Sequence, residues 1–161
     1  MNLSKISFHT GDAVLFLGRH YLAFDIENRL TVPSWYHEPL SMGGIITRGF
    51  DSNLWVLPDL TFQKVCLRLR EMNLADPLAR LLLRMVLGYA YELQMDQSGS
   101  IMVPQNLQEY ANLINKVVVI GQGDYFEIWD PVLWKKQEAQ LSDAESNKER
   151  FARLTIATSA P

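Results

Sequence analysis

The chain has 161 residues, of which 48% are hydrophobic and 20% charged, enough for one compact domain or two small ones. Its net charge of −3 gives no general affinity for nucleic acid, so any DNA-binding site must be a local basic patch. The single cysteine, Cys66, excludes an internal disulfide and indicates a reducing compartment. Because the sequence has neither a secretory signal nor an apolar run approaching a membrane span of ~20 residues, we expect a cytoplasmic protein without membrane contact.

One segment of the sequence occurs twice. Residues 25–33 (DIENRLTVP) return as residues 96–104 (DQSGSIMVP), with the two aspartates 71 residues apart. The match continues between residues 44–58 and 116–130 at a spacing of 72. A repeat of this length predicts two copies of one supersecondary module that share a core. It also argues against an enzyme, because catalytic groups rarely come in two equivalent sets along a short chain.

The first copy follows an N-terminal extension (residues 1–14) and is expected to span residues 15–72. Its strand formers, turn residues and Pro33 predict a hairpin over residues 24–32 and then a short helix. The elements expected are a strand at 15–24, a turn at 25–28, a return strand at 30–32, a helix at 34–40, strands at 45–47 and 54–57, and a helix at 58–72.

A linking helix is expected within residues 73–88. Asp76 fits its cap and Pro77 its first turn, and its apolar composition predicts that it is buried. The second copy is expected at residues 89–141, with its elements in the same order. A helix opened by Asp130 and Pro131 carries charges of both signs and is expected to face solvent. Residues 142–161 then form the end of that helix and a tail without fixed structure.

Catalytic and metal chemistry find little support. The three histidines, His9, His20 and His37, have no metal-ligand spacing, and no cofactor is expected. Residues 121–124 (GQGD) precede a predicted strand and not a helix, so they indicate a hairpin turn instead of a phosphate loop. Asp25 and Asp96 suggest a carboxylate pair, but an aspartate at the first corner of a turn more simply bonds the backbone two residues on.

The paired segments resemble the MraZ family of bacterial transcriptional regulators, in which each half carries Asp-x-x-Gly-Arg followed by an apolar stretch and proline. Four further segments, in the family's order and spacing, strengthen the resemblance, which covers about residues 16–136. They are residues 16–18 (FLG), 47–58 (TRGFDSNLWVLP), 76–80 (DPLAR) and 121–130 (GQGDYFEIWD).

The resemblance implies an α+β fold of two AbrB-like half-units, whose swapped β-hairpins form a small β-barrel with flanking helices. It further implies a ring-shaped homo-oligomer, nucleoid-associated, that binds repeated double-stranded DNA sites in the promoter of the division and cell-wall gene cluster as a repressor. Arg29 would contact DNA, and Asp25 would orient the hairpin or that arginine. The same rim could hold Arg19, His20 and Arg48.

The sequence departs from the family motif at three positions. Asn28 replaces the usual glycine, Glu27 occupies a position that is often lysine, and Ser100 replaces the second arginine. Glu27 would push a DNA phosphate away. Three alternatives therefore stay open: a pairing of Arg29 with Asp25 that only fixes the hairpin, a protein-interaction or scaffold ring with decayed DNA contacts, and an antitoxin sharing the AbrB-like half-barrel.

Overall fold

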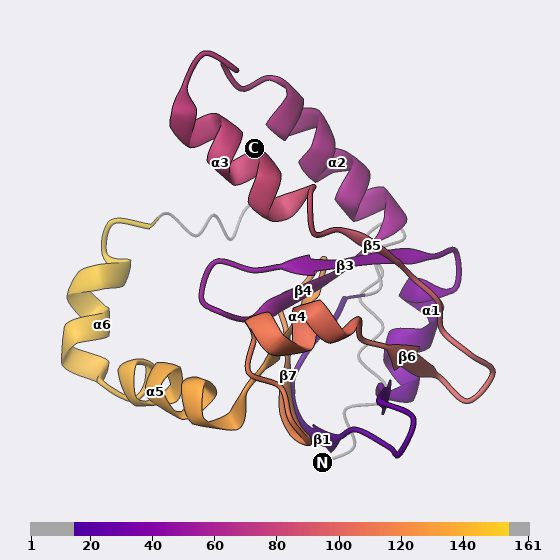
Figure 1. Ribbon diagram of the computed structural model, residues 1–161. Coiled ribbons are helices and arrows are strands. Elements are labelled where there is room, and N and C mark those ends of the chain that lie inside the picture. Colours follow the sequence, from indigo (N-terminus) through magenta and orange to yellow (C-terminus); the bar gives the residue numbers. More distant parts are fainter. Residues whose placement is uncertain (1–14, 155–161) are drawn as a thin grey trace. The chain divides into compact units, whose positions relative to one another are not determined.

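The computed structural model describes residues 15–154, so the expected extension at residues 1–14 and the end of the tail lie outside the described residues. The α+β class is confirmed (Figure 1). In chain order the elements are β1 Arg19–Ala23, β2 Arg29–Thr31, the 3-10 helix η1 Ser34–Tyr36, α1 His37–Leu40, β3 Gly44–Arg48, β4 Leu54–Pro58, α2 Asp59–Arg70, α3 Pro77–Val86, β5 Tyr91–Leu93, β6 Ser100–Met102, α4 Gln105–Tyr110, β7 Lys116–Gly121, β8 Phe126–Trp129, α5 Pro131–Leu141 and α6 Ala144–Phe151.

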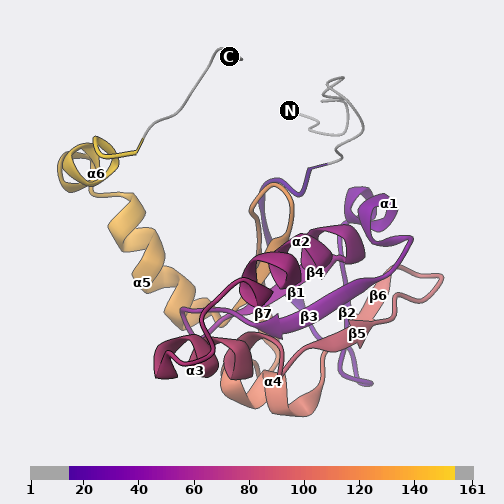
Figure 2. The same cartoon turned by 90° about the horizontal axis from the view of Figure 1, so that it is seen from above.

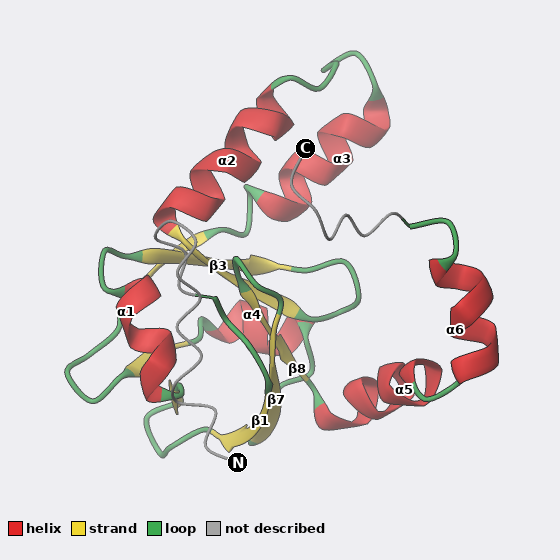
Figure 3. Ribbon diagram, turned by 180° about the vertical axis from the view of Figure 1, so that it is seen from behind, coloured by secondary structure: helices red, strands yellow, loops and turns green. Residues whose placement is uncertain are grey.

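The two repeats exchange strands. Six strands form one antiparallel sheet in the order β1-β7-β8-β4-β3-β5, and β2 and β6 form a separate two-stranded ladder. Figure 3 shows β1, β7, β8 and β3 of the larger sheet from behind. The first strand of each repeat therefore pairs within the other repeat, β1 with β7 and β5 with β3. Neither half of the chain can complete its share of the sheet alone, which explains why the repeats share a single core.

An approximate two-fold axis relates the repeats. Leu30 lies opposite Ile101 in the β2–β6 ladder, and these are equivalent positions of the two repeats. Trp55 lies opposite Glu127 in the β4–β8 pair, and these are equivalent positions as well. Because residues that match in the sequence face each other at both places, the axis passes through both strand pairs.

The predicted hairpin at residues 24–32 forms only in part. Its turn closes, with the Asp25 amide donating to the Arg29 carbonyl oxygen at 2.9 Å. The flanking strands, however, pair with β7 and β6 of the other repeat and not with each other. The expected barrel is likewise not one closed sheet in residues 15–154, because the strands divide between the six-stranded sheet and the ladder.

Large apolar side chains from both repeats fill the core. Leu30 and Ile101 are fully buried where the repeats meet. Phe16, Tyr36 and Phe126 form an aromatic group, with ring centroids 4.8 Å apart for Phe16 and Tyr36 and 5.1 Å apart for Tyr36 and Phe126. Burial raises the pKa of Tyr36 to about 12, and its hydroxyl donates to the Leu17 carbonyl oxygen at 2.9 Å. This core fixes where β2 and β6 lie.

Helices α2 and α3 lie on the side of β3 and β5 away from β1 (Figures 1 and 2). The predicted start of α3 is confirmed, since the Asp76 side chain accepts a hydrogen bond from the Leu78 amide at 2.8 Å and Pro77 opens the helix. The prediction that α3 is buried is wrong, because only Ala79 and Val86 of this helix are buried. A prediction from composition overestimates the burial of a helix that is apolar on most sides when the rest of the chain covers only one of those sides.

Within the described residues, 131–154 belong to a compact unit distinct from that of residues 15–130. The single charged helix expected there is two helices, because α5 ends at Leu141 and α6 begins at Ala144. Asp143 causes the restart, since its carboxylate accepts a hydrogen bond from the Ser146 amide at 3.1 Å and caps α6.

Candidate nucleic-acid interface

The two repeated motifs form the same turn. The Oδ1 atom of Asp25 accepts hydrogen bonds from the amides of Glu27 at 2.8 Å and Arg29 at 2.9 Å. The Oδ1 atom of Asp96 does the same with the amides of Ser98 at 2.9 Å and Ser100 at 3.0 Å. The predicted role of both aspartates as turn-fixing acceptors is confirmed.

The fourth residue of each turn adopts a left-handed backbone conformation. Asn28 has φ of 58° and Gly99 has φ of 77°. Asparagine tolerates this region better than most residues, and glycine adopts it without a Cβ penalty. A Cβ at Gly99 would also collide with the imidazole ring of His37, so any other residue in the second turn would force that ring to move. Asn28 is therefore a permitted replacement of glycine, as the sequence suggested.

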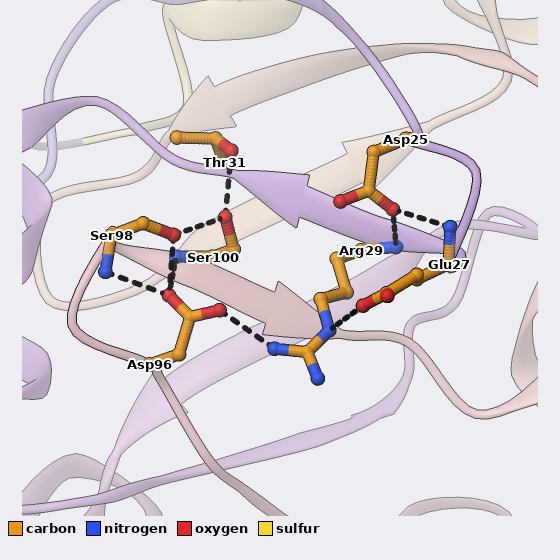
Figure 4. A network of polar contacts seen from close by, with 7 residues as sticks. All are labelled: Asp25, Glu27, Arg29, Thr31, Asp96, Ser98 and Ser100. Atoms are coloured by element: carbon orange, nitrogen blue, oxygen red, sulfur yellow. Dashed lines mark hydrogen bonds and ion pairs between the residues drawn. The ribbon is translucent and has the colours of Figure 1, made fainter.

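Arg29 crosses from the first repeat to the second (Figure 4). Its Nη1 atom donates to Oδ2 of Asp96 at 2.7 Å. The alternative that the Arg29 side chain is paired with Asp25 is wrong. The Asp25 carboxylate accepts a hydrogen bond from the backbone amide of Arg29 and not from its guanidinium. The strand exchange is responsible, since β2 pairs with β6 over only three residues, and the Arg29 side chain reaches from one end of this short antiparallel ladder to the turn at its other end.

The surroundings of the Arg29 guanidinium are acidic. Its Nε atom lies 3.2 Å from Oε2 of Glu27, an ion pair, and 34% of the Arg29 side chain is exposed. Arg29 is the single positive charge among the four ionisable residues Asp25, Glu27, Arg29 and Asp96, which together carry a charge of −2. This part of the surface presents an arginine, but it is not a basic patch.

The Asp96 carboxylate is held in its charged form. The hydrogen bond from the Ser98 hydroxyl, helped by the Ser100 amide and Arg29, lowers the pKa of Asp96 to about 2. The Ser98 hydroxyl donates to Oδ1 at 2.6 Å. Asp96 therefore stays negative at any ordinary pH and can hold Arg29 throughout.

The matching position of the second repeat has no arginine. Ser100 is buried and its hydroxyl lies 2.7 Å from Oγ1 of Thr31 and 3.0 Å from Oγ of Ser98. In the described residues no arginine pairs with Asp25 in the way that Arg29 pairs with Asp96. The interface is thus asymmetric: one turn carries the arginine and the other holds it.

Arg19 and His20 do not join this group. Both lie at the start of β1, and the four strand steps from Arg19 to Ala23 alone cover about 13 Å before the turn begins. Arg19 stacks on the Tyr21 ring with 5.6 Å from its guanidinium carbon to the ring centroid. His20 lies with Nε2 3.1 Å from the Leu17 carbonyl oxygen and packs edge-on against Trp35.

Arg48 has a structural contact of its own. Its guanidinium carbon lies 3.3 Å from the ring centroid of Tyr89 and 4.4 Å from that of Tyr110. The Tyr110 hydroxyl donates to the Gly49 carbonyl oxygen at 2.8 Å, so the same tyrosine also holds the β3–β4 turn. Two aromatic faces around one guanidinium stabilise this corner. They leave Arg48 a weak candidate for contact with a phosphate.

Sequence reasoning missed the role of Asp96. It identified Asp96 as a turn residue but not as the partner of Arg29, since 67 residues separate the two. The signal was available in the repeat itself. Two matching motifs on short strands with apolar partners of similar size at Leu30 and Ile101 could have suggested that the motifs pair with each other.

The described residues offer no metal site and no membrane span. Within residues 15–154, His, Cys, Asp and Glu side chains do not gather in groups of three that could hold a metal ion. The helices of the same part of the chain are too short or too polar to cross a bilayer.

Comparison with known proteins adds the decisive observation. The family model described as "MraZ protein", with the further label "antitoxin-like", matches residues 15–85 and again residues 86–156. The chain belongs to the MraZ family. The two matches meet at residues 85 and 86, the last two residues of α3, and agree with the internal repeat, so the exchanged strands are strands of two MraZ units.

Relatives of the chain in the MraZ family come from distant bacteria. A protein of Thermomicrobium roseum is 34% identical over 141 residues, covering 87% of this chain and 99% of the relative. One from Leuconostoc mesenteroides is 35% identical over 133 residues, covering 83% of this chain and 93% of the relative. Both are named "Transcriptional regulator MraZ". This name describes a regulator and not an enzyme, in agreement with the prediction that this chain is not an enzyme.

Proposed function

We propose that this MraZ-family protein is a sequence-specific DNA-binding transcriptional regulator that contacts double-stranded DNA through Arg29. In this proposal it assembles into a ring-shaped homo-oligomer on repeated sites in the promoter of the division and cell-wall gene cluster and represses it. It would act in the cytoplasm, associated with the nucleoid. The observation that carries the proposal is the Arg29 side chain, whose guanidinium is held by Asp96 while one-third of the side chain is still exposed.

A held arginine is suited to contact a base. The ion pair with Asp96 fixes the guanidinium before DNA arrives, so less side-chain entropy is lost on binding. Arginine has five N–H donors. One of them, on Nη1, donates to Asp96, and Glu27 forms an ion pair at Nε without a hydrogen bond. A bidentate contact with guanine contributes ~1–3 kcal/mol of discrimination. Repetition around a ring makes such a weak contact sufficient through avidity.

The first experiment compares wild type with Arg29→Ala on a fluorescent duplex carrying the organism's own division-cluster promoter, at two salt concentrations. We expect tight binding that weakens steeply with salt in the wild type and is lost in the variant. Arg153→Ala is the matched control, since it removes an equal charge from an exposed position outside the interface. Equal binding by all three proteins would contradict the assignment of the contact to Arg29.

Glu27→Gln tests the same contact in the opposite direction. Glu27 is exposed and lies beside the Arg29 guanidinium, so its charge repels a phosphate and competes for the arginine. Removal of that charge should raise the affinity for the promoter duplex several-fold if Arg29 contacts DNA. In an Arg29→Ala background the same substitution should have a smaller effect, and an undiminished effect would show that Glu27 acts on DNA independently.

A scaffold ring without a DNA site is the second candidate, favoured by the charge of −2 at the paired turns and by Ser100 in place of a second arginine. The salt series distinguishes the two candidates. A scaffold would assemble with the same mass but bind the promoter no better than a random duplex at either salt concentration.

A further inference from the structure

The first turn carries an acidic side chain beside its arginine. The Glu27 side chain is 67% exposed and forms an ion pair with Arg29, the residue that the proposed function places on DNA. A carboxylate repels the DNA phosphates, which supply most of the sequence-independent affinity of a DNA-binding protein. Affinity for the DNA backbone therefore does not explain a glutamate at this place.

The backbone of the turn holds Glu27 in a fixed position. Its amide donates to Oδ1 of Asp25 at 2.8 Å, and the same oxygen accepts from the Arg29 amide at 2.9 Å. The side chains of Glu27 and Arg29 leave this backbone two residues apart and meet, with Oε2 of Glu27 3.2 Å from Nε of Arg29 (Figure 4). The turn therefore presents a negative and a positive group side by side.

The Glu27 carboxylate keeps its capacity to accept hydrogen bonds. The Nε atom of Arg29 has no hydrogen-bond partner in the described part of the chain, so its contact with Oε2 is an ion pair only. Within residues 15–154, the other oxygen of Glu27, Oε1, takes part in no hydrogen bond or ion pair. An ionised carboxylate accepts at both oxygens. Glu27 can therefore bind a donor outside the chain while Asp96 still holds Arg29.

The second turn has no such acceptor. Ser98 occupies the position equivalent to Glu27. Its hydroxyl donates to Oδ1 of Asp96 at 2.6 Å and lies 3.0 Å from Oγ of Ser100, so it is engaged within its own turn. The pair of a charged donor and a charged acceptor is thus a feature of the first turn and not of the second.

The two bases of a G·C pair match the two side chains. In the major groove guanine presents the acceptors O6 and N7, to which arginine donates, and cytosine presents its N4 amino group, from which glutamate accepts. The O6 and N4 atoms of one pair are hydrogen-bonded, about 2.9 Å apart, and neighbouring bases of a strand are about 3.4 Å apart. Both separations are close to the 3.2 Å between Oε2 of Glu27 and Nε of Arg29.

We propose that Glu27 is a specificity-determining residue, which accepts a hydrogen bond from the N4 amino group of a cytosine in or next to the base pair that Arg29 contacts. The inference rests on the proposed function, since it requires Arg29 in the major groove. The charge of Glu27 lowers the affinity for every duplex, and the hydrogen bond offsets this cost only where the cytosine is present. Guanine and thymine present acceptors in the major groove, which a carboxylate cannot bind. Glu27 therefore excludes wrong sequences as well as favouring the right one.

Modified cytosines test the contact. The cytosines at each position of the repeated promoter site are replaced together by N4-methylcytosine, which still pairs with guanine but has a methyl group instead of the N4 hydrogen that faces the major groove. Binding by the full-length wild type should fall about tenfold at one position, the effect of one hydrogen bond to a charged group. Binding by Glu27→Ala should not fall at that position.

Two substitutions of Glu27 separate its charge from its acceptor. Glu27→Gln keeps a side-chain oxygen that can accept, whereas Glu27→Ala keeps neither the charge nor the acceptor. Both should bind a random duplex more tightly than the wild type does. Glu27→Ala should reduce the preference for the promoter over the random duplex about tenfold, and Glu27→Gln by less. Glu149→Gln is the matched control, because it removes an equal charge from an exposed position of α6 and should change neither affinity.

The outcomes distinguish this inference from the proposed function. A cytosine effect that persists in Glu27→Ala, or its absence from a wild type that prefers the promoter, would overturn the role of Glu27 and leave the contact of Arg29 in place. Equal gains of Glu27→Ala on the promoter and random duplexes would do the same, because Glu27 would then only repel DNA. A wild type without preference for the promoter would overturn the proposed function, and this inference with it.

Discussion

The Asp25 turn and the Asp96 turn have the same backbone but opposite roles. In each, the aspartate accepts two amide hydrogen bonds and the fourth residue is left-handed. The first turn extends an arginine, and the second supplies the carboxylate that holds it. Duplication thus preserved the backbone geometry, while the side chains diverged into a contacting residue and a positioning residue.

This difference teaches that the backbone of the motif tolerates change better than its side-chain pairing. Asn28 in place of glycine leaves the turn intact. Ser100 in place of arginine leaves the second turn intact as well, but removes the partner that Asp25 would have had. Four predictions test the comparison, ordered from the largest expected effect to the smallest.

The largest effect is expected where the repeats meet. Leu30→Ala and Ile101→Ala each remove a fully buried side chain, and each should lower the free energy of unfolding by about 2–5 kcal/mol. Because these residues face each other, the double variant should lose less than the sum of the two. Urea denaturation of the three variants measures this. Strict additivity would show that the two residues do not share a cavity.

The left-handed positions should respond differently. Gly99→Ala should lower the free energy of unfolding by about 1–2 kcal/mol through the left-handed backbone alone. The total loss should be larger, because the new methyl group also meets the His37 ring. Asn28→Gly places the family's glycine in the first turn and should change stability by less than about 1 kcal/mol. Thermal melting of both variants provides the comparison. Equal losses of stability in the two variants would contradict the conclusion that a side chain at position 99 is crowded and that one at position 28 is not.

The two aspartates should differ in how much they stabilise the fold. Asp96→Asn should lower the melting temperature more than Asp25→Asn, since only Asp96 also holds the Ser98 hydroxyl and Arg29. The pKa of Asp96 in the folded state is lowered to about 2 from its usual 3.8, so its stabilising effect is complete above the usual value. It should be lost as the pH falls from about 4 to about 2. Melting temperatures measured from pH 7 to pH 2 should therefore converge for wild type and Asp96→Asn.

The smallest effect is expected in the β4–β8 strand pair, where Trp55 lies opposite Glu127 near the approximate two-fold axis. Burial raises the pKa of Glu127, although the Trp129 indole donates to its Oε2 atom at 2.8 Å. The charged carboxylate therefore costs stability as the pH rises above its usual value. The free energy of unfolding of Glu127→Gln should rise relative to that of the wild type between pH 4 and pH 8. The increase should be less than about 1 kcal/mol, about the size of one hydrogen bond. Denaturant titrations at both pH values measure the change, and a gain independent of pH would exclude the charge as its cause.

Local chemistry made much of the fold predictable. Asp76 and Pro77 start α3 through contacts with the residues next to them, and the strands flanking residues 48–53 and 121–125 are recognisable from their apolar runs and turn residues. The burial of α3 was not predictable in this way. Composition shows how much apolar surface a helix has, but not how much of it the rest of the chain covers.

The sequence by itself determined the repeat, the turns and the family. These features depend on residues that are close together in the chain, such as an aspartate and the amides two and four residues after it. Only the tertiary structure decided that Arg29 pairs with Asp96 and that Arg48 lies between two tyrosines. The exchange of strands between the repeats brings these distant residues together. The pairing of the strands depends on contacts between residues far apart in the chain, so a local sequence pattern cannot predict it.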